Sequence, residues 1–187
     1  MNAITRLDNQ LYSLSGDDAY LYTPEDLRCL TGTLSTGAYR SLLKRAQTAG
    51  VVTPVCRGLY LYTKSRHHKG DLLFHAAARL RANCFNYISL ETALSDAGII
   101  SQIPLQWITI MSSGRSSSIC CDPFGTIEFV HTKKAPGDLV KELVYDRRCR
   151  LWRATPALAL RDLRRVGRNL DLVDWEAYHE SVREPYP

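Results

Sequence analysis

The sequence contains no apolar run of about 18 residues, the length that a membrane-spanning helix requires. Its first ten residues, MNAITRLDNQ, also lack the apolar stretch of a secretory signal. We therefore expect a cytoplasmic protein that has no membrane partner. A hydrophobic fraction of 45% in 187 residues is ordinary for a globular chain, and it allows one large domain or two small ones.

Motifs for catalysis and metal binding are missing as well. The sequence has no C-x-x-C pair, no H-E-x-x-H, no G-x-x-x-x-G-K-[ST], no G-x-S-x-G and no paired-carboxylate motif. Of the histidines, His67 and His68 are neighbours, and His75 in LLFHAAARL is interpreted as a partly buried helix residue rather than a ligand. We expect no enzyme activity, no cofactor and no metal.

The six cysteines are scattered along the chain, at Cys29, Cys56, Cys84, Cys120, Cys121 and Cys149. Adjacent residues such as Cys120 and Cys121 seldom form a relaxed disulfide or two ligands of one zinc site. We interpret the cysteines as reduced and mostly buried small apolar residues, with a regulatory thiol as the alternative.

Acidic residues are absent from one segment. The net charge of +5 is concentrated near the N-terminus, because residues 1–70 hold nine Lys or Arg against five Asp or Glu, whereas residues 71–187 hold fifteen against fourteen. Residues 35–69 contain no acid and seven basic side chains, namely Arg40, Lys44, Arg45, Arg57, Lys64, Arg66 and Lys69. Such a segment is typical of a surface that binds a polyanion.

Two short helices are predicted before this basic segment. Apolar residues at Ile4, Leu7, Leu11 and Leu14 have the spacing of one helix face, so we expect a helix over 2–14 that ends at Ser15-Gly16-Asp17-Asp18. Tyr20-Leu21-Tyr22 is expected to be briefly extended. Thr23-Pro24-Glu25-Asp26 then combines an N-cap hydroxyl, a proline and two acids, which predicts a second helix as far as about Leu30.

A third helix is predicted from Ser35, as N-cap, to Ala49, with Gly50 as a left-handed C-cap residue. Helical projection divides it into an apolar side (Ala38, Leu42, Ala46, Ala49) and a polar, cationic side (Thr36, Gly37, Arg40, Lys44, Gln47). Tyr39 and Arg45 fall at the boundaries between the two. One side is therefore expected to pack and the other to face outward.

A β-hairpin is predicted next, with strands at 51–55 and 59–62 joined by Cys56-Arg57-Gly58. Two helices, a basic helix and a hairpin follow one another in the order of a winged helix-turn-helix. We therefore predict a winged helix-turn-helix domain over 1–64, followed by a polar linker at 63–70.

The rest of the chain, 71–187, is predicted to form a mixed α+β domain whose sheet order the sequence does not define. Helices are expected at 71–82, 90–97, 156–166 and 171–183, and strands at 85–89, 107–112 and 126–132. Ser113–Ser118 is expected to be a turn. The predicted fold class is thus α+β, with an N-terminal winged helix-turn-helix and a C-terminal α+β domain.

The candidate DNA-binding residues are Ser35, Thr36, Gly37, Tyr39, Arg40, Lys44, Arg45, Arg57, Lys64 and Arg66. Arg40 and Lys44 would enter a major groove, the helix start would approach a phosphate, and Arg57 would contact the backbone from the hairpin tip. Each assignment has an alternative. Arg40 and Lys44 could belong to an ordinary solvated helix face, Arg57 could be an exposed turn arginine, and Lys64 and Arg66 could belong to a basic linker. For Tyr39 core packing is favoured over a groove contact, and Arg45 can simply snorkel.

A second basic region spans Lys133 to Arg168, where eleven Lys or Arg face four acids. It could contact nucleic acid or an acidic partner. Ordinary amphipathic helix surface is the favoured interpretation, and the acidic last helix can neutralise part of it.

Four segments carry a family resemblance: SLLKRAQTAGVV, RGLY, YISLETALSDAGII and ATPALALRDLRR. In their order and spacing they resemble the AbiEi family of antitoxins and transcriptional regulators, from type IV toxin-antitoxin (abortive-infection) systems of bacteria. The resemblance implies a winged domain that binds operator repeats and represses its own operon. In that winged domain, Thr36, Arg40 and Lys44 would face the DNA groove and Arg57 would lie on the wing. The resemblance also implies a C-terminal domain that opposes a nucleotidyltransferase-like toxin without a stable complex.

The resulting hypothesis is an autorepressor of double-stranded operator DNA that acts as an antitoxin. It needs no cofactor and can bind paired repeats cooperatively, while its oligomeric state is left open. The alternatives are a stand-alone regulator, a protein-interaction module without a toxin partner, and a nucleic-acid-processing enzyme.

Overall fold

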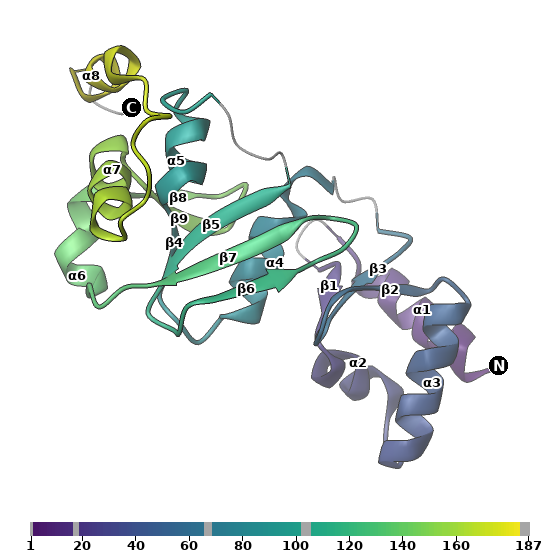
Figure 1. The fold of residues 1–187 in the computed structure, drawn as a ribbon. Coiled ribbons are helices and arrows are strands. Elements are labelled where there is room, and N and C mark those ends of the chain that lie inside the picture. Colours follow the sequence, from purple (N-terminus) through teal and green to yellow (C-terminus); the bar gives the residue numbers. More distant parts are fainter. Residues whose placement is uncertain (1, 17–18, 66–68, 102–105, 184–187) are drawn as a thin grey trace. The chain divides into compact units, whose positions relative to one another are not determined.

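The computed structural model describes residues 2–16, 19–65, 69–101 and 106–183. The fold is mixed α+β, as predicted, and divides into two compact units, Met1–Leu72 (unit 1) and Leu73–Pro187 (unit 2) (Figure 1). Within the described ranges, no helix has the length and apolar character needed to cross a membrane.

Unit 1 contains a group of helices and one small sheet. Its elements are α1 (Ala3–Leu14), β1 (Leu21–Tyr22), α2 (Pro24–Thr31), α3 (Thr36–Thr48), β2 (Val52–Cys56) and β3 (Leu59–Tyr62). The sheet is antiparallel with the order β1-β3-β2. The three predicted helices, the short extended piece and the hairpin are confirmed. Arg66, His67, His68, Asp17 and Asp18, which belong to the predicted linker and helix end, lie outside the described residues.

Side-chain caps explain where the helices of unit 1 begin. The Thr23 hydroxyl accepts a hydrogen bond from the Asp26 amide at 3.2 Å, while the Asp26 carboxylate accepts one from the Thr23 amide at 2.7 Å. The Ser35 hydroxyl likewise accepts from the Ala38 amide at 3.3 Å. Both predicted helix starts are confirmed, because these oxygens satisfy first-turn amides that have no partner inside a helix.

The core of unit 1 corrects the predicted faces of two helices. The buried residues of α3 are Tyr39, Leu42, Leu43 and Ala46, whereas Ala38 and Ala49 are exposed. The larger side chains of Tyr39 and Leu43 fill the core, so the packed face is turned away from the two terminal alanines. In α1, Leu7 and Leu11 are buried, but Leu14 is 51% exposed at the end of the helix.

Unit 2 is built on a mixed six-stranded sheet with the order β6-β7-β5-β4-β9-β8. Its strands are β4 (Asn86–Ile88), β5 (Trp107–Ser112), β6 (Ser117–Cys120), β7 (Thr126–His131), β8 (Leu143–Asp146) and β9 (Leu151–Ala154). The short helix η1 (Lys69–Asp71) comes just before unit 2 in the chain. The helical elements that follow are α4 (Leu72–Leu80), α5 (Leu90–Asp96), α6 (Pro136–Leu139), η2 (Val140–Glu142), α7 (Pro156–Arg165) and α8 (Trp175–Arg183). In Figure 1, α4 crosses behind the sheet, and α5 and α7 lie next to each other.

Several elements of unit 2 differ from the prediction. The predicted turn at Ser113–Ser118 overlaps a strand, because Ser117 and Ser118 begin the edge strand β6 (Ser117–Cys120), which pairs with β7. The β8–β9 hairpin was not predicted, because its strands are only four residues long and their apolar residues do not alternate with polar ones. The last helix begins at Trp175 instead of Asp171, since the Asp174 carboxylate accepts from the amides of Glu176 and Ala177 and so supplies the start.

A buried polar network ties the sheet of unit 2 to α7. The Asp162 carboxylate, 0% exposed, accepts hydrogen bonds from the Tyr87 hydroxyl at 2.8 Å and the Ser89 hydroxyl at 3.0 Å. The Lys134 ammonium lies 2.9 Å from the same carboxylate and supplies the opposite charge. A buried carboxylate is tolerated when it is paired and hydrogen-bonded in this way.

Replacing Lys134 by Met should remove the nearer of the two cations beside the buried Asp162 carboxylate and leave only the Arg165 guanidinium, at 3.8 Å. We expect the free energy of unfolding to fall by about 2 to 4 kcal/mol, since Tyr87 and Ser89 still donate hydrogen bonds. Urea denaturation followed by tryptophan fluorescence measures this, because Trp107, Trp152 and Trp175 all lie in unit 2.

The matched control is Lys133→Met, a neighbouring exposed lysine, which should change stability by no more than about 0.5 kcal/mol. Equal effects of the two substitutions would contradict the proposed importance of the buried pair.

Candidate nucleic-acid interface

The outward face of α3 carries three exposed cations, Arg40, Lys44 and Arg45. Arg40 and Lys44 are four residues apart, so their side chains lie on the same side of the helix, one turn from each other. Among the described residues neither forms an ion pair, and the Arg45 Nε donates only to the Ser41 carbonyl, at 3.4 Å. The outward face of α3 is therefore cationic, as predicted, and the charges of Arg40 and Lys44 are not neutralised by ion pairs among the described residues.

The start of α3 is open. Ser35, Thr36 and Gly37 are all exposed, and a Cβ added at Gly37 would meet no atom within 4 Å. The first-turn amides of a helix have no acceptor within the helix, and they carry the positive end of its dipole. An anion can therefore approach this end without a steric barrier from the glycine.

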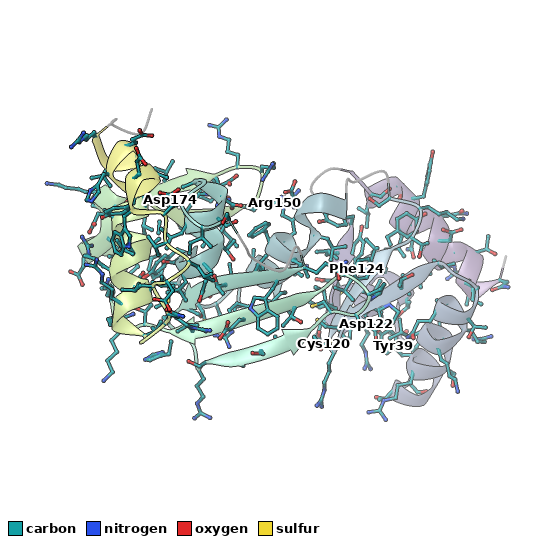
Figure 2. All side chains as sticks on the ribbon, turned by 45° about the horizontal axis from the view of Figure 1, so that its top comes forward. Tyr39, Cys120, Asp122, Phe124, Arg150 and Asp174 are labelled. Carbon is teal, nitrogen blue, oxygen red and sulfur yellow. The ribbon has the colours of Figure 1, made fainter. Side chains whose placement is uncertain are left out.

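Tyr39, labelled in Figure 2, belongs to the core of unit 1 and not to this surface. It is 6% exposed, and its hydroxyl donates to the Pro24 carbonyl at 2.5 Å. Burial, followed by the effects of Tyr60 and Glu25, raises the pKa of Tyr39 to about 12, so the hydroxyl stays protonated as a donor. We therefore leave Tyr39 out of the interface and assign it to holding α3 against the start of α2.

Arg28 is a residue that the sequence analysis overlooked. It is exposed at the end of α2, where its guanidinium lies 5.6 Å from the centroid of the Tyr39 ring and donates to the Leu34 carbonyl at 3.5 Å. It thus bridges the turn between α2 and α3. The available signal was a basic residue in the last turn of a helix just before Gly32.

Arg57 lies where the sequence predicted it, in the turn between β2 and β3. The turn is possible because Gly58 adopts a φ of +83°, which only glycine accepts without strain. Arg57 is exposed and has no ion-pair partner in the described part of the chain. It is available as a cation at the tip of the hairpin.

Lys64 differs from the other predicted cations. Its ammonium forms an ion pair with the Asp8 carboxylate at 2.5 Å, and the Tyr62 hydroxyl donates to the same carboxylate at 2.9 Å. Its charge is therefore used to tie α1 to the end of β3. Lys64 is left out of the proposed interface, and Arg66 lies outside the described residues.

Five basic residues of the second basic region, Lys133–Arg168, are neutralised by ion pairs inside unit 2. Ion pairs join Lys134 and Arg165 to Asp162, Arg153 to Asp96 and Asp146, Arg161 to Glu142, and Arg168 to Glu91 and Glu128. The Arg164 guanidinium faces the Trp175 ring at 5.5 Å. The acids that neutralise the region come mostly from the sheet, α5 and α7, and not from the last helix as the sequence suggested.

Cysteine and histidine residues offer little chemistry in the described structure. All six cysteines are free thiols, but only Cys121 and Cys149 are buried, which corrects the expectation that most would be. Burial, followed by Asp146, raises the pKa of the Cys149 thiol to about 12 and so suppresses its thiolate. His75 is buried, with Nε2 2.6 Å from the Arg148 carbonyl. No group of three His, Cys, Asp or Glu residues is placed to hold a metal, as far as the described residues go.

Comparison of the chain with protein-family models and with curated proteins finds no match.

The Asp8–Lys64 pair makes a prediction about pH. Burial raises the pKa of Asp8, but hydrogen bonds from Lys64 and Tyr62 and the Lys64 charge outweigh it, so the pKa lies below its ordinary value. A carboxyl whose folded pKa is lowered adds stability that is present at neutral pH and is lost as the pH falls through that pKa. In Lys64→Met we expect the Asp8 pKa to rise and this acid-sensitive part of the stability to shrink.

An NMR titration of the Asp8 carboxyl carbon measures the Asp8 pKa in the wild type and in Lys64→Met. It runs between about pH 2 and 6, a range that brackets ordinary carboxyl pKa values. Lys44→Met serves as the control, because Lys44 forms no ion pair in the described structure. An unchanged Asp8 pKa in Lys64→Met would refute the ion pair.

Proposed function

We propose that the protein binds double-stranded DNA through unit 1, folded as a winged helix-turn-helix. The observation that carries the proposal is the outward face of α3, where Arg40 and Lys44 are exposed one turn apart and form no ion pair with any residue that the structure describes. The order of α2, α3 and the β2–β3 hairpin supports the same proposal, since α3 takes the place of a recognition helix and the hairpin that of a wing.

The proposed mechanism separates affinity from sequence choice. Arg57 on the wing and the open amides at Thr36 and Gly37 would contact phosphates, which supply affinity that falls with salt. Arg40 and Lys44 would reach base edges in the major groove, where a cationic side chain pairs well with guanine acceptors. Tyr39 and Arg28 would hold α3 in position without touching DNA themselves.

The resemblance to AbiEi antitoxins extends the proposal to a cytoplasmic autorepressor that opposes a nucleotidyltransferase-like toxin without a stable complex. All four resembling segments form defined structures. SLLKRAQTAGVV is most of α3 with the start of β2, and RGLY is the hairpin turn with the start of β3. YISLETALSDAGII is the end of β4 with α5, and ATPALALRDLRR is the end of β9 with α7. Under this proposal paired operator repeats would be bound, unit 2 would carry the antitoxin role, and a stand-alone regulator is the alternative. A protein-interaction module, whose cationic face docks an acidic protein, would shift no duplex.

The double variant Arg40→Ala/Lys44→Ala should lose selective binding to the DNA upstream of the protein's own coding sequence. Each lost phosphate contact lowers the slope of log affinity against log salt by about 0.9, and each lost base contact costs about 1 to 3 kcal/mol at one base pair. A fluorescence-anisotropy titration at several salt concentrations, with a scrambled duplex in parallel, measures both effects.

The matched control is Lys133→Ala/Lys141→Ala, which removes the same charge from exposed positions in unit 2. It should bind as the wild type does. Weak, equal binding of both duplexes by wild type and variant would reject the proposed function, and equal losses in the two double variants would reject the placement of the interface on α3.

A further inference from the structure

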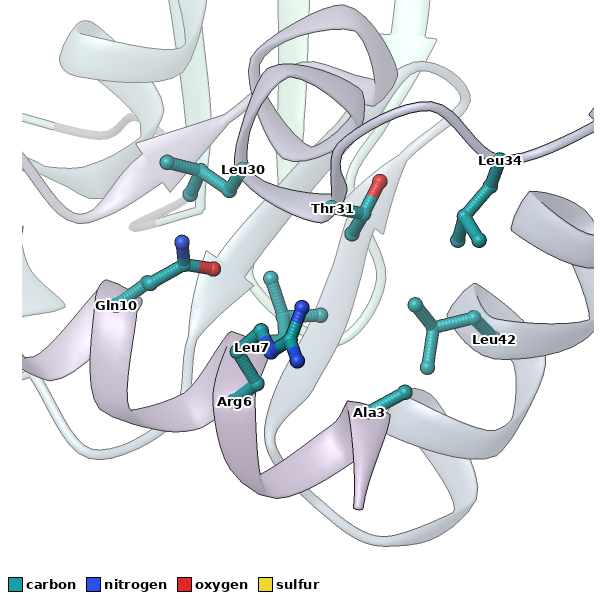
Figure 3. Close-up of a pocket in the computed structure, with 8 residues that line it drawn as sticks. All are labelled: Ala3, Arg6, Leu7, Gln10, Leu30, Thr31, Leu34 and Leu42. Carbon is teal, nitrogen blue, oxygen red and sulfur yellow. The ribbon is translucent and has the colours of Figure 1, made fainter. Parts of the chain in front are cut away.

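A cavity of about 160 Å³ lies within unit 1, between α1, the end of α2 and α3 (Figure 3). Its lining residues are Ala3, Arg6, Leu7, Gln10, Leu30, Thr31, Leu34 and Leu42. Four of the eight are leucines, so the walls are mainly apolar. A closed apolar cavity of about 150 Å³ is known to take up benzene, and the cavity of unit 1 therefore has room for one aromatic ring.

Two polar side chains from α1 break the apolar lining. The Gln10 Oε1 is shielded from solvent and accepts no hydrogen bond from the described residues, which is unfavourable for a buried acceptor. Arg6 is exposed and forms no ion pair among the described residues, and Figure 3 shows its guanidinium reaching from α1 into the same space. Arg6 and Gln10 are four residues apart and therefore lie on one side of α1.

These groups define the chemistry of an occupant. The leucines favour a flat apolar ring, the unpaired guanidinium favours a carboxylate, and the Gln10 amide needs a hydrogen-bonding group. A hydroxyl suits the amide best, because it can donate to the oxygen and can also accept from the nitrogen if the amide is turned over.

We propose that this cavity binds a small aromatic carboxylic acid that carries a ring hydroxyl. The ring would lie against Leu7 and Leu42. Because the Gln10 Oε1 is closed off from solvent, the amide would have to turn toward the ring for this oxygen to accept from the hydroxyl. For this, the long and exposed Arg6 side chain has to withdraw to the mouth of the cavity, where it would meet the carboxylate. A hydroxyl meta to the carboxylate suits the two side chains best, because Arg6 and Gln10 leave the α1 backbone about one helical turn, roughly 5.4 Å, apart.

The position of the cavity couples it to α3. Leu42 belongs to α3 itself, and Leu34 directly precedes the Ser35 cap of that helix. A bound acid would therefore adjust how α3 packs against α1 and α2. If the protein binds DNA as proposed, this change in the packing of α3 would make operator binding respond to the acid. We expect operator binding to weaken, because the acid also adds negative charge beside α3.

Binding is tested on the full chain without DNA, by ¹H–¹⁵N NMR titration with 3-hydroxybenzoate, 2-hydroxybenzoate, benzoate and benzamidine. We expect saturable shifts at residues of α1 and α3 with 3-hydroxybenzoate, with a Kd on the order of 1 mM or below, as suits about ten non-hydrogen atoms. Benzoate lacks the hydroxyl and should bind about three- to tenfold more weakly. The isomer 2-hydroxybenzoate, with its hydroxyl beside the carboxylate, should be weaker too, and the cation benzamidine should not bind.

Three variants locate the site. Arg6→Gln should weaken 3-hydroxybenzoate binding by about tenfold or more, as the loss of a charge-assisted contact requires. Gln10→Leu should remove the preference for 3-hydroxybenzoate over benzoate while benzoate still binds. Lys141→Gln, which removes one charge from an exposed position in unit 2, should bind as the wild type does.

Absence of saturable shifts with every acid would overturn the proposal, as would equal binding of benzamidine or unchanged binding in both Arg6→Gln and Gln10→Leu. The operator titration is then repeated with 3-hydroxybenzoate present. An acid that binds but leaves operator affinity unchanged overturns the coupling to α3. A chain that binds the acid but no duplex overturns the proposed DNA binding and leaves the acid site supported.

Discussion

The packing of one face of α3 into the core of unit 1 is the contact on which the candidate interface depends. Tyr39, Leu42, Leu43 and Ala46 remove that face from water, which leaves Arg40 and Lys44 no orientation except outward. The Tyr39 hydroxyl, bonded to the Pro24 carbonyl, fixes the helix against the element that precedes it. The buried residues of α3 therefore determine the direction in which Arg40 and Lys44 point, although they are not themselves part of the candidate interface.

Whether a cation can act on a partner depends on the acids around it. Arg40, Lys44 and Arg57 lie in a segment without acids, and their charges are not used by ion pairs within the described structure. Lys64 belongs to the same segment, yet Asp8 comes from α1 and neutralises it. Lys134, Arg153, Arg161 and Arg168 are neutralised in the same way in unit 2. The same residue type is therefore structural where an acid lies beside it and available for binding where none does.

Unit 2 uses buried polarity for a different purpose. The Asp162 carboxylate on α7 accepts hydrogen bonds from the Tyr87 and Ser89 hydroxyls and forms an ion pair with Lys134. One carboxylate therefore joins three segments that are distant in sequence. Burial, together with Asp162, raises the pKa of Tyr87, which keeps its hydroxyl a donor at any physiological pH. Such a network specifies how α7 lies on the sheet, because any other placement would leave a buried charge unpaired.

Local signals in the sequence determined the elements of unit 1. The Thr23-Pro24 start, the Ser35 cap and the Cys56-Arg57-Gly58 turn each act within a few residues, and each was predicted correctly. The depletion of acids from 35–69 likewise identified the cationic surface, because net charge is a property of composition.

Tertiary structure alone decided the features that need partners from elsewhere in the chain. The strands β6, β8 and β9 are short and lack an alternating apolar pattern, so their pairing with neighbours, and not their own sequence, makes them strands. The sheet order, the Asp8–Lys64 and Asp162–Lys134 pairs and the cavity beside Gln10 depend on residues that are brought together only by folding. Composition shows how many charges the chain holds, but only the packed structure decides which of them are already paired.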